Sequence, residues 1–306
     1  MNSYVGYGNF TPGSSGTATV AGTGSVWNSS NIFVVGNTVQ GTLNISLGGT
    51  VNSAGTNEIG GFLSGTGTVN VDGAGSLWNQ TGTLIFGDES AASGTLNITN
   101  GGKTTSQNVT MAEAAGSVAA ATINGTTSEW SITGGLIIGN EAGATVTVQN
   151  GGLLTTNGTT TTLAAVNTGV GIVNVTGAGS QWSAGTVRIG QLGDGTVNVT
   201  NGGTVNASST TIGNNGGFTS ELIVNGTGSL YNNTGNMFVG GNTGTGEVKL
   251  SSGGRLSVTG NLTLGQLNNA TGRIIIGTGG TGGTLDVTEV VGSAAGFASS
   301  VDFNPQ

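Results

Sequence analysis

The chain has 306 residues, of which 63 are glycine and only 6% are charged. Thirteen acidic residues outnumber five basic ones, and the net charge of −8 argues against a nucleic-acid partner, which needs a basic surface. The sequence contains no Cys and no His, which excludes disulfides, thiolate chemistry and the usual neutral-pH base, and no apolar run reaches the ~20 residues that span a bilayer.

The predicted elements, taken in chain order, are short β-strands that begin every 24 to 27 residues. In "TVNV" at Thr68, as in its counterparts, apolar and polar residues alternate, and a period of two indicates strands rather than helices. A second apolar segment, such as "LIFG" at Leu84, usually closes each unit with Gly, so each unit should carry about three strands. The opening strands begin at Thr17, Thr42, Thr68, Thr95, Ala120, Thr145, Ile172, Thr196, Glu221, Glu247 and Arg273.

The repeat has a second level, in which every other unit carries an aromatic residue in the frame Gly-x-Gly-Ser-x-Trp or a close variant of it. These aromatics lie 51, 52, 52 and 49 residues apart, at Trp27, Trp78, Trp130, Trp182 and Tyr231. The units between them carry a Gly-Gly pair, at Gly48 and Gly49, Gly101 and Gly102, Gly151 and Gly152, Gly202 and Gly203, and Gly253 and Gly254. We expect these pairs at corners of the chain, where a positive φ is needed and Gly has no Cβ to oppose it.

One coil of a parallel β-helix fits these units best, because a propeller blade needs four strands and usually ~40 residues. Each strand would lie about 4.8 Å from its counterpart one coil earlier, so about 11 coils of 24 to 27 residues would form a body roughly 50 Å long. We expect residues 1–288 to form this all-β solenoid. The frame breaks after "TLDV" at Thr284, and residues 289–306 are expected to be an irregular segment that caps the last coil or begins a further region.

The aromatic residues are expected to fill the core at one corner of the coil. About 9.6 Å would separate residues two coils apart, which is too far for ring stacking. Each ring should therefore pack against aliphatic residues of the coils between them: Val51, Leu154, Val205 or Leu256. The alternative is an exposed aromatic stripe that binds carbohydrate, which strong quenching of tryptophan fluorescence by acrylamide would reveal.

Carboxylates recur in the turn after the closing segment, at Asp88, Glu89, Glu113 and Glu141, with Asp194 further along. Stacked about 4.8 Å apart, two of them could approach the ~5–5.5 Å separation of a retaining glycosidase pair. Oxygen ligands from adjacent turns could also hold a weakly bound Ca²⁺. Because no Arg or His lies nearby to tune an acid, we expect instead a solvated acidic edge, with no catalytic residue, metal or cofactor.

The segment "GIVNVTGAGSQWSAGTVRIGQLGDGTVNVTNGGTVNASSTTIG" from Gly171 resembles the repeats of bacterial autotransporter (type V secretion) passengers and of exported proteins with the related autotransporter/PEP-CTERM-associated repeat. The resemblance extends from about Tyr4 to Val287. It implies a right-handed, single-stranded parallel β-helix that projects from the outer membrane, often as an adhesin. The first ten residues lack the cationic and apolar regions of a signal peptide, so we expect any export leader to lie outside this chain.

The sequence therefore predicts a non-enzymatic β-helical passenger, secreted or exposed at the cell surface, that acts as an adhesin stalk or structural spacer. Its expected partner is a glycan or protein of a host or cell surface, and the coil ends could also support self-association. A polysaccharide-binding or polysaccharide-degrading protein and a self-assembling extracellular filament subunit are the alternatives.

Overall fold

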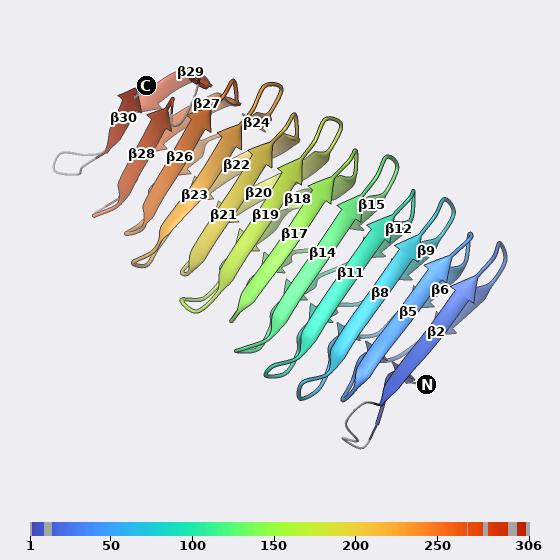
Figure 1. The fold of residues 1–306 in the computed structure, drawn as a ribbon. Helices are drawn as coiled ribbons and strands as arrows, with labels where there is room; N and C mark the ends of the chain where they lie inside the picture. Colours follow the sequence, from blue (N-terminus) through green and yellow to red (C-terminus); the bar gives the residue numbers. More distant parts are fainter. Residues whose placement is uncertain (1, 9–13, 268, 278–280, 293–298, 304–306) are drawn as a thin grey trace.

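The computed structural model describes residues 2–8, 14–267, 269–277, 281–292 and 299–303. Within these ranges the chain forms thirty β-strands and no helix. The strands wind into a solenoid of about 11 coils, which runs as one rod from the N-terminal to the C-terminal side of the picture (Figure 1). The predicted all-β parallel solenoid is confirmed.

The longest face of each coil is one strand of a 12-stranded sheet. Most of these strands have seven residues, and buried and partly exposed positions alternate along them, as in β8, where Val69 and Val71 point inward. The strands are β2 (Ser15–Ala21), β5 (Gln40–Ser46), β8 (Thr66–Asp72), β11 (Ser93–Thr99), β14 (Val118–Asn124), β17 (Gly143–Gln149), β19 (Val170–Thr176), β21 (Asp194–Thr200), β23 (Thr219–Asn225), β26 (Thr245–Ser251), β28 (Thr271–Ile276) and β30 (Ser300–Phe303).

The remaining two faces form an 18-stranded sheet. The strands of the second face are β3 (Val26–Ser29), β6 (Thr50–Ser53), β9 (Leu77–Gln80), β12 (Lys103–Ser106), β15 (Glu129–Ile132) and β24 (Leu230–Asn233). Those of the third face are β1 (Ser3–Val5), β4 (Phe33–Val35), β7 (Asn57–Ile59), β10 (Leu84–Phe86), β13 (Val109–Met111), β16 (Leu136–Ile138) and β25 (Met237–Val239). Five coils join the two faces in one strand: β18 (Leu153–Leu163), β20 (Gln181–Ile189), β22 (Thr204–Ile212), β27 (Arg255–Leu264) and β29 (Thr284–Val291).

The expectation of three separate strands in every coil is therefore only partly correct. In β18 the two short faces run together, and the pairing of β18 with β20 shifts between Thr156 and Thr160. The chain bends at this shift without leaving the sheet. All eleven strand starts predicted from the sequence lie in successive strands of the long face, and the named strands of both sheets pair in parallel.

The long strands also align polar side chains from coil to coil. Asn97 Nδ2 donates to Asn70 Oδ1 and Asn70 Nδ2 donates to Asn44 Oδ1, each over 2.9 Å. Ladders of stacked polar residues are thus present on this face. They satisfy side-chain amides that would otherwise compete for the backbone.

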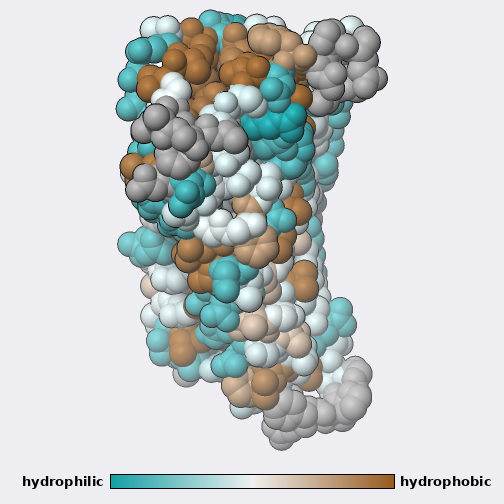
Figure 2. All heavy atoms as spheres, turned by 90° about the vertical axis from the view of Figure 1, so that its left-hand side faces the viewer, coloured by the Kyte–Doolittle hydropathy of each residue, from teal (hydrophilic) through white to brown (hydrophobic). Residues whose placement is uncertain are grey.

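The turns that lead into the long strands differ from coil to coil in length and composition. On the side of the molecule that faces the viewer in Figure 2, hydrophobic and hydrophilic residues are interspersed along the rod. Phe62, Leu192 and Phe218 are exposed hydrophobic residues in three of these turns. The regular sheets are therefore joined by irregular turns along this side of the rod.

In successive coils, the turn that contains the Gly-Gly pair is hydrogen-bonded to the turn that contains the Gly-x-Gly-Ser frame or its variant. Gly101 has a φ of 87°, and a Cβ on Gly102 would lie 2.2 Å from the carbonyl oxygen of Val71. Both glycines are therefore needed, the first for its backbone conformation and the second for its close approach to the preceding coil. Ser128 Oγ donates to the carbonyl of Asn124 and accepts from the N–H of Gly101.

The same serine contact recurs at the other corners of this type. The backbone N–H groups of Gly48, Gly151 and Gly202 donate to the hydroxyls of Ser76, Ser180 and Ser229 over 3.0 to 3.1 Å. The Gly253 and Gly254 pair has the same shape, with a φ of 84° at Gly253 and the carbonyl of Val224 beside Gly254. Two consecutive coils thus form one interlocked unit.

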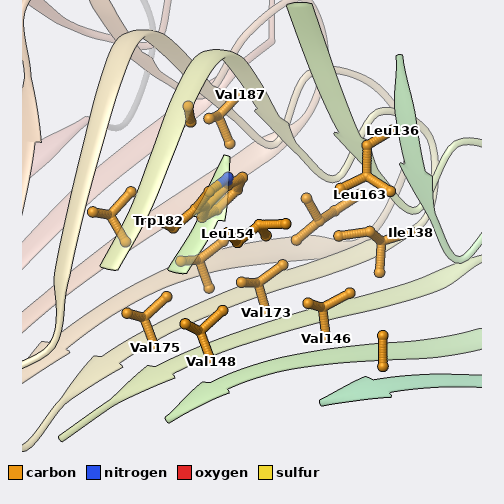
Figure 3. Packing of buried hydrophobic residues seen from close by; sticks show 14 of the residues in the cluster. Leu136, Ile138, Val146, Val148, Leu154, Leu163, Val173, Val175, Trp182 and Val187 are labelled. Carbon is orange, nitrogen blue, oxygen red and sulfur yellow. The ribbon is translucent and has the colours of Figure 1, made fainter. Parts of the chain in front are cut away.

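One continuous apolar core runs along the rod from Val5 to Ile276. Trp78, Trp130, Trp182 and Tyr231 are fully buried in it, whereas Trp27 is partly exposed. Figure 3 shows Trp182 beside Leu154, its register partner in the preceding coil, above valines of the long strands. Val51, Val205 and Leu256 likewise pair in register with aromatic positions, as expected.

Two features of this corner were not expected. Phe33 lies between two tryptophans, with ring centroids 5.0 Å from Trp27 and 6.3 Å from Trp78, so aromatic as well as aliphatic residues pack the rings. Between Trp78 and Trp130 the register position is held by Thr104, whose buried hydroxyl has no hydrogen-bond partner.

Each buried indole donates its N–H to the preceding coil. Trp78 Nε1 donates to Ser53 Oγ over 3.2 Å, and Trp130 Nε1 donates to Ser106 Oγ over 3.0 Å. Trp182 Nε1 donates to Thr156 Oγ1 over 3.1 Å. A buried indole needs such an acceptor, because a buried N–H without a partner costs about 1–3 kcal/mol.

The repeat continues into the segment that the sequence indicated as irregular. β29 extends to Val291, and β30 pairs in parallel with β28. Arg273 bridges Asp302 and Glu247, so ion pairs join β26, β28 and β30 where earlier coils have Thr and Asn. Residues 293–298, which include Phe297, lie outside the described residues.

Candidate functional site

The first candidate site is the acidic edge, formed by Asp88, Glu89, Glu113 and Glu141 in turns of successive coils and by Glu58 in a strand of the preceding coil. Because Phe86 pairs with Met111 in register, Asp88 and Glu113 occupy equivalent positions in adjacent turns. The turns stack through backbone hydrogen bonds: Asp88 N–H donates to Gly60 O, and Glu141 N–H donates to Ala112 O. Asp194 lies elsewhere, at the start of β21 opposite Val170.

Glu58 joins this edge although it belongs to a strand, β7. Gly61 occupies the turn position equivalent to Asp88, and a Cβ there would lie 2.5 Å from Glu58 Oε2. The carboxylate of Glu58 therefore fills the space that a side chain at position 61 would take. This contact was not expected, because it depends on a glycine in the turn that follows the strand of Glu58.

The environment of three of these carboxyl groups, those of Glu58, Asp88 and Glu113, favours their protonated forms. Burial, followed by the nearby charges of Asp88 and Glu89, raises the pKa of Glu58 to about 7. Burial also raises the pKa of Asp88, with Glu89 adding to the effect. The pKa of Glu113 is raised by burial and by Asp88 and Glu141 on either side. A carboxyl group with a pKa near 7 can exchange a proton at neutral pH.

The acidic edge does not bring together a recognisable metal site. Among the described residues, no group of three or more His, Cys, Asp or Glu side chains is arranged to hold a metal ion. In the same part of the chain, no helix is long and apolar enough to cross a membrane.

The aromatic and glycine candidates lie within the scaffold. The four fully buried rings line the interior of the second face, which rules out an exposed aromatic stripe at those positions. The Gly-Gly pairs lie at the corner between the long strands and the second face, where they close turns. The four buried rings and the glycines position the strands and present no side chain to a ligand.

The second candidate site is a polar trough, which the sequence analysis missed. It consists of two adjoining hollows of about 370 and 380 Å³ that share Asn79 and Thr81. We define the polar trough by Asn28, Asn52, Asn79, Gln80, Thr81 and Thr105. It runs along the rod at the corner between the second and third faces.

The local fold explains where the trough lies. Its hollows lie along five coils in which the second and third faces are separate strands joined by a turn, from β3 and β4 to β15 and β16. Farther along, β18, β20 and β22 continue without a break through this corner. The corner is therefore hollowed on the N-terminal part of the rod.

An asparagine ladder forms one wall of the trough. Asn52 Nδ2 donates to Asn28 Oδ1 over 2.8 Å, and Asn79 Nδ2 donates to Asn52 Oδ1 over 3.3 Å. Thr105 Oγ1 then donates to Asn79 Oδ1 over 2.6 Å. The recurring Asn after the aromatic or Val position, in "VWNS", "TVNS" and "LWNQ", is the sequence signal that could have indicated this wall.

Gln80 lies under the trough and is only 3% exposed. Its Oε1 accepts a hydrogen bond from Ser106 Oγ over 2.9 Å, whereas its buried Nε2 has no partner. A buried amide donor without an acceptor is rare in native proteins.

Comparisons with known proteins add little to this description. No family model matches the sequence, and no curated protein matches it. Among solved structures, the chain is similar to a crystal structure of a TibA fragment, hyper-glycosylated by TibC. The identity is 18%, the TM-score is 0.37, and the match covers 98% of each chain. A likeness this weak carries no argument about activity or ligand.

Proposed function

We propose that this chain is a non-enzymatic β-helical passenger, exposed at the cell surface or secreted, that acts as an adhesin stalk or structural spacer. The observation that carries the proposal is the unbroken parallel register of the 12-stranded sheet, from β2 to β30. The repeat frame, which resembles that of autotransporter passengers, agrees with it.

The architecture suits a spacer because its length is fixed by coil count. Each coil adds about 4.8 Å, so the eleven steps between the twelve long strands correspond to about 53 Å. The core is continuous and neighbouring coils share backbone hydrogen bonds, so bending at one coil would break contacts on both sides. Regular columns of polar groups on the outer faces would offer many weak contacts, which gain by avidity when many copies are displayed.

The spacer role can be tested with spin labels, because the chain has no Cys of its own. Thr17→Cys and Thr196→Cys would place labels on one column of the long face, seven strands apart. We expect a single narrow distance distribution centred at about 34 Å. A broad distribution would contradict a rigid spacer.

The adhesin role and the absence of catalysis need separate measurements. Beads coated with the chain should adhere to host cells or to spots of a glycan array more strongly than beads coated with an unrelated acidic protein. Release of reducing ends from polysaccharides, lost in Glu58→Gln, would contradict the non-enzymatic part of the proposal. Glu58 is the variant of choice because of its raised pKa.

A further inference from the structure

We propose that the polar trough binds an extended, neutral polysaccharide chain that lies along the axis of the rod. This inference deepens the proposed function and rests on it for the biological setting, since it names the class of ligand that an adhesin of this shape would hold. The binding itself follows from the chemistry of the trough.

The walls of the trough offer neutral hydrogen-bonding groups. The residues that line its two hollows are Asn, Gln, Ser, Thr and Ala, with no charged side chain among them. Asn52 uses one N–H and one lone pair of its oxygen within the ladder, so it retains a second N–H and a second lone pair. A sugar hydroxyl is both donor and acceptor and can pair with both.

The spacing of the ladder suits a polymer. Asn28, Asn52 and Asn79 are register partners in consecutive coils, so equivalent amides recur about every 4.8 Å along the axis. This spacing is close to the length of one hexose residue in an extended chain. Successive sugars could therefore meet an equivalent amide in the three coils of Asn28, Asn52 and Asn79 and a hydroxyl, Thr105, in the fourth.

Gln80 provides an independent indication of a ligand. Its Nε2 is buried at the trough and has no partner in the protein, which leaves a donor without an acceptor. A ring or hydroxyl oxygen of a bound sugar would supply that acceptor once the Gln80 side chain turns toward the trough that it lines. At the register positions before and after Gln80, Ser53 and Ser106 each accept a hydrogen bond from an indole N–H, so the unpaired donor is peculiar to this coil.

The same features disfavour the other extended polymers. A peptide that binds by strand addition needs a free sheet edge, but β6 and β9 beside the trough are paired on both sides along the rod. Among the described strands, β3 pairs only with β6, and a strand added to its other side would extend the sheet beyond the trough rather than fill it. An anionic glycan would meet a chain of net charge −8 and no basic side chain in the trough. A neutral polysaccharide meets neither obstacle.

Titration calorimetry or fluorescence titration with cellohexaose as the probe tests the inference, with a hexagalacturonate and an uncharged extended peptide as comparison ligands. We expect cellohexaose to bind and the Asn52→Ala/Asn79→Ala variant to lose about tenfold or more in affinity, as expected for several lost hydrogen bonds. Asn206→Ala/Asn232→Ala is the matched control. These residues form the same ladder contact, over 3.2 Å, in the same column but outside the trough, and their loss should leave affinity unchanged.

A second variant guards against an effect on folding. Thr81 is exposed and lies in both hollows, so Thr81→Phe should block the trough without altering the core. Loss of binding in this variant, with an unchanged melting temperature, would support the inference. Failure of cellohexaose to bind, equal binding by the trough and control variants, or preferential binding of the peptide or the hexagalacturonate would each overturn it.

The outcome is separable from that of the proposed function. If coated beads adhere to cells and the Thr81→Phe protein adheres equally well, the adhesin role stands and the trough is not its ligand site. If cellohexaose binds in the trough while coated beads do not adhere, the ligand class stands and the adhesin role fails.

Discussion

Replacing Thr104 by valine should stabilise the protein. Thr104 is fully buried between Trp78 and Trp130, and its hydroxyl has no hydrogen-bond partner. The equivalent positions in other coils hold Val51, Leu154, Val205 and Leu256. Valine has nearly the same shape as threonine, so the exchange removes an unsatisfied polar group and leaves the packing in place.

The size of the effect follows from the cost of the lost hydration. A buried hydroxyl without a partner costs about 1–3 kcal/mol, which Thr104→Val would recover. With an unfolding entropy of roughly 2.1 cal/mol/K per residue over the 306 residues, this corresponds to a rise in melting temperature of about 2–5 °C.

Differential scanning calorimetry of two neighbouring variants provides the test. Thr105→Val is the matched control, because Thr105 points outward and its Oγ1 donates to Asn79 Oδ1. Its melting temperature should fall or stay constant, while that of Thr104→Val rises. If Thr104→Val melted at or below the wild-type temperature, the hydroxyl would have a partner and the reasoning would be wrong.

Three further predictions concern Glu58 at the acidic edge, the hydrogen bond between Ser128 and Gly101, and the partly exposed ring of Trp27. The folded protein binds a proton at Glu58 more tightly than the unfolded chain does, so its contribution to stability is present below pH 4.5 and is lost as the pH rises through about 7. Glu58→Gln should therefore stabilise the protein at pH 8 by about 1 kcal/mol after allowance for solvent screening, and much less at pH 4; equal effects at both pH values in urea unfolding would contradict this. Ser128→Ala should lower the free energy of unfolding by about 1–3 kcal/mol in the same assay, because the buried N–H of Gly101 loses its acceptor. An unchanged unfolding midpoint would show that this hydrogen bond does not stabilise the corner. Trp27 is the only partly exposed tryptophan, since the other three are fully buried, so Trp27→Phe should abolish most acrylamide quenching. Persistent quenching would show that a second indole ring is accessible.

The regular part of the fold was predictable because its signal repeats. The alternation around Thr68 and its ten counterparts marked every long strand except β30, whose four residues are too short a run to reveal a period. The need for Gly101 and Gly102 followed from chain geometry at a corner. The joining of two faces in β18 was not predictable, since Thr-rich sequence continues through a bend as readily as it forms a turn.

The candidate sites were less predictable because they depend on contacts between unlike positions. Asp88 and Glu113 were expected to stack, and the register places them in equivalent turns. Glu58 was missed, since its place at the acidic edge depends on the absent side chain of Gly61. The polar trough was missed because a hollow arises from the path of the backbone between two strands, which the residues at the corner do not specify by themselves.

The pairing of indole donors with hydroxyl acceptors constrains how such a chain can evolve. Each buried tryptophan needs a coil with Ser or Thr before it, and each Gly-Gly corner needs a coil with Ser after it. Duplicating a coil that carries a ring would place two bulky rings in adjacent coils. Duplicating a coil without a ring would place two such coils side by side. The gene should therefore lengthen or shorten by about fifty codons at a time, and relatives of different length should differ by even numbers of coils.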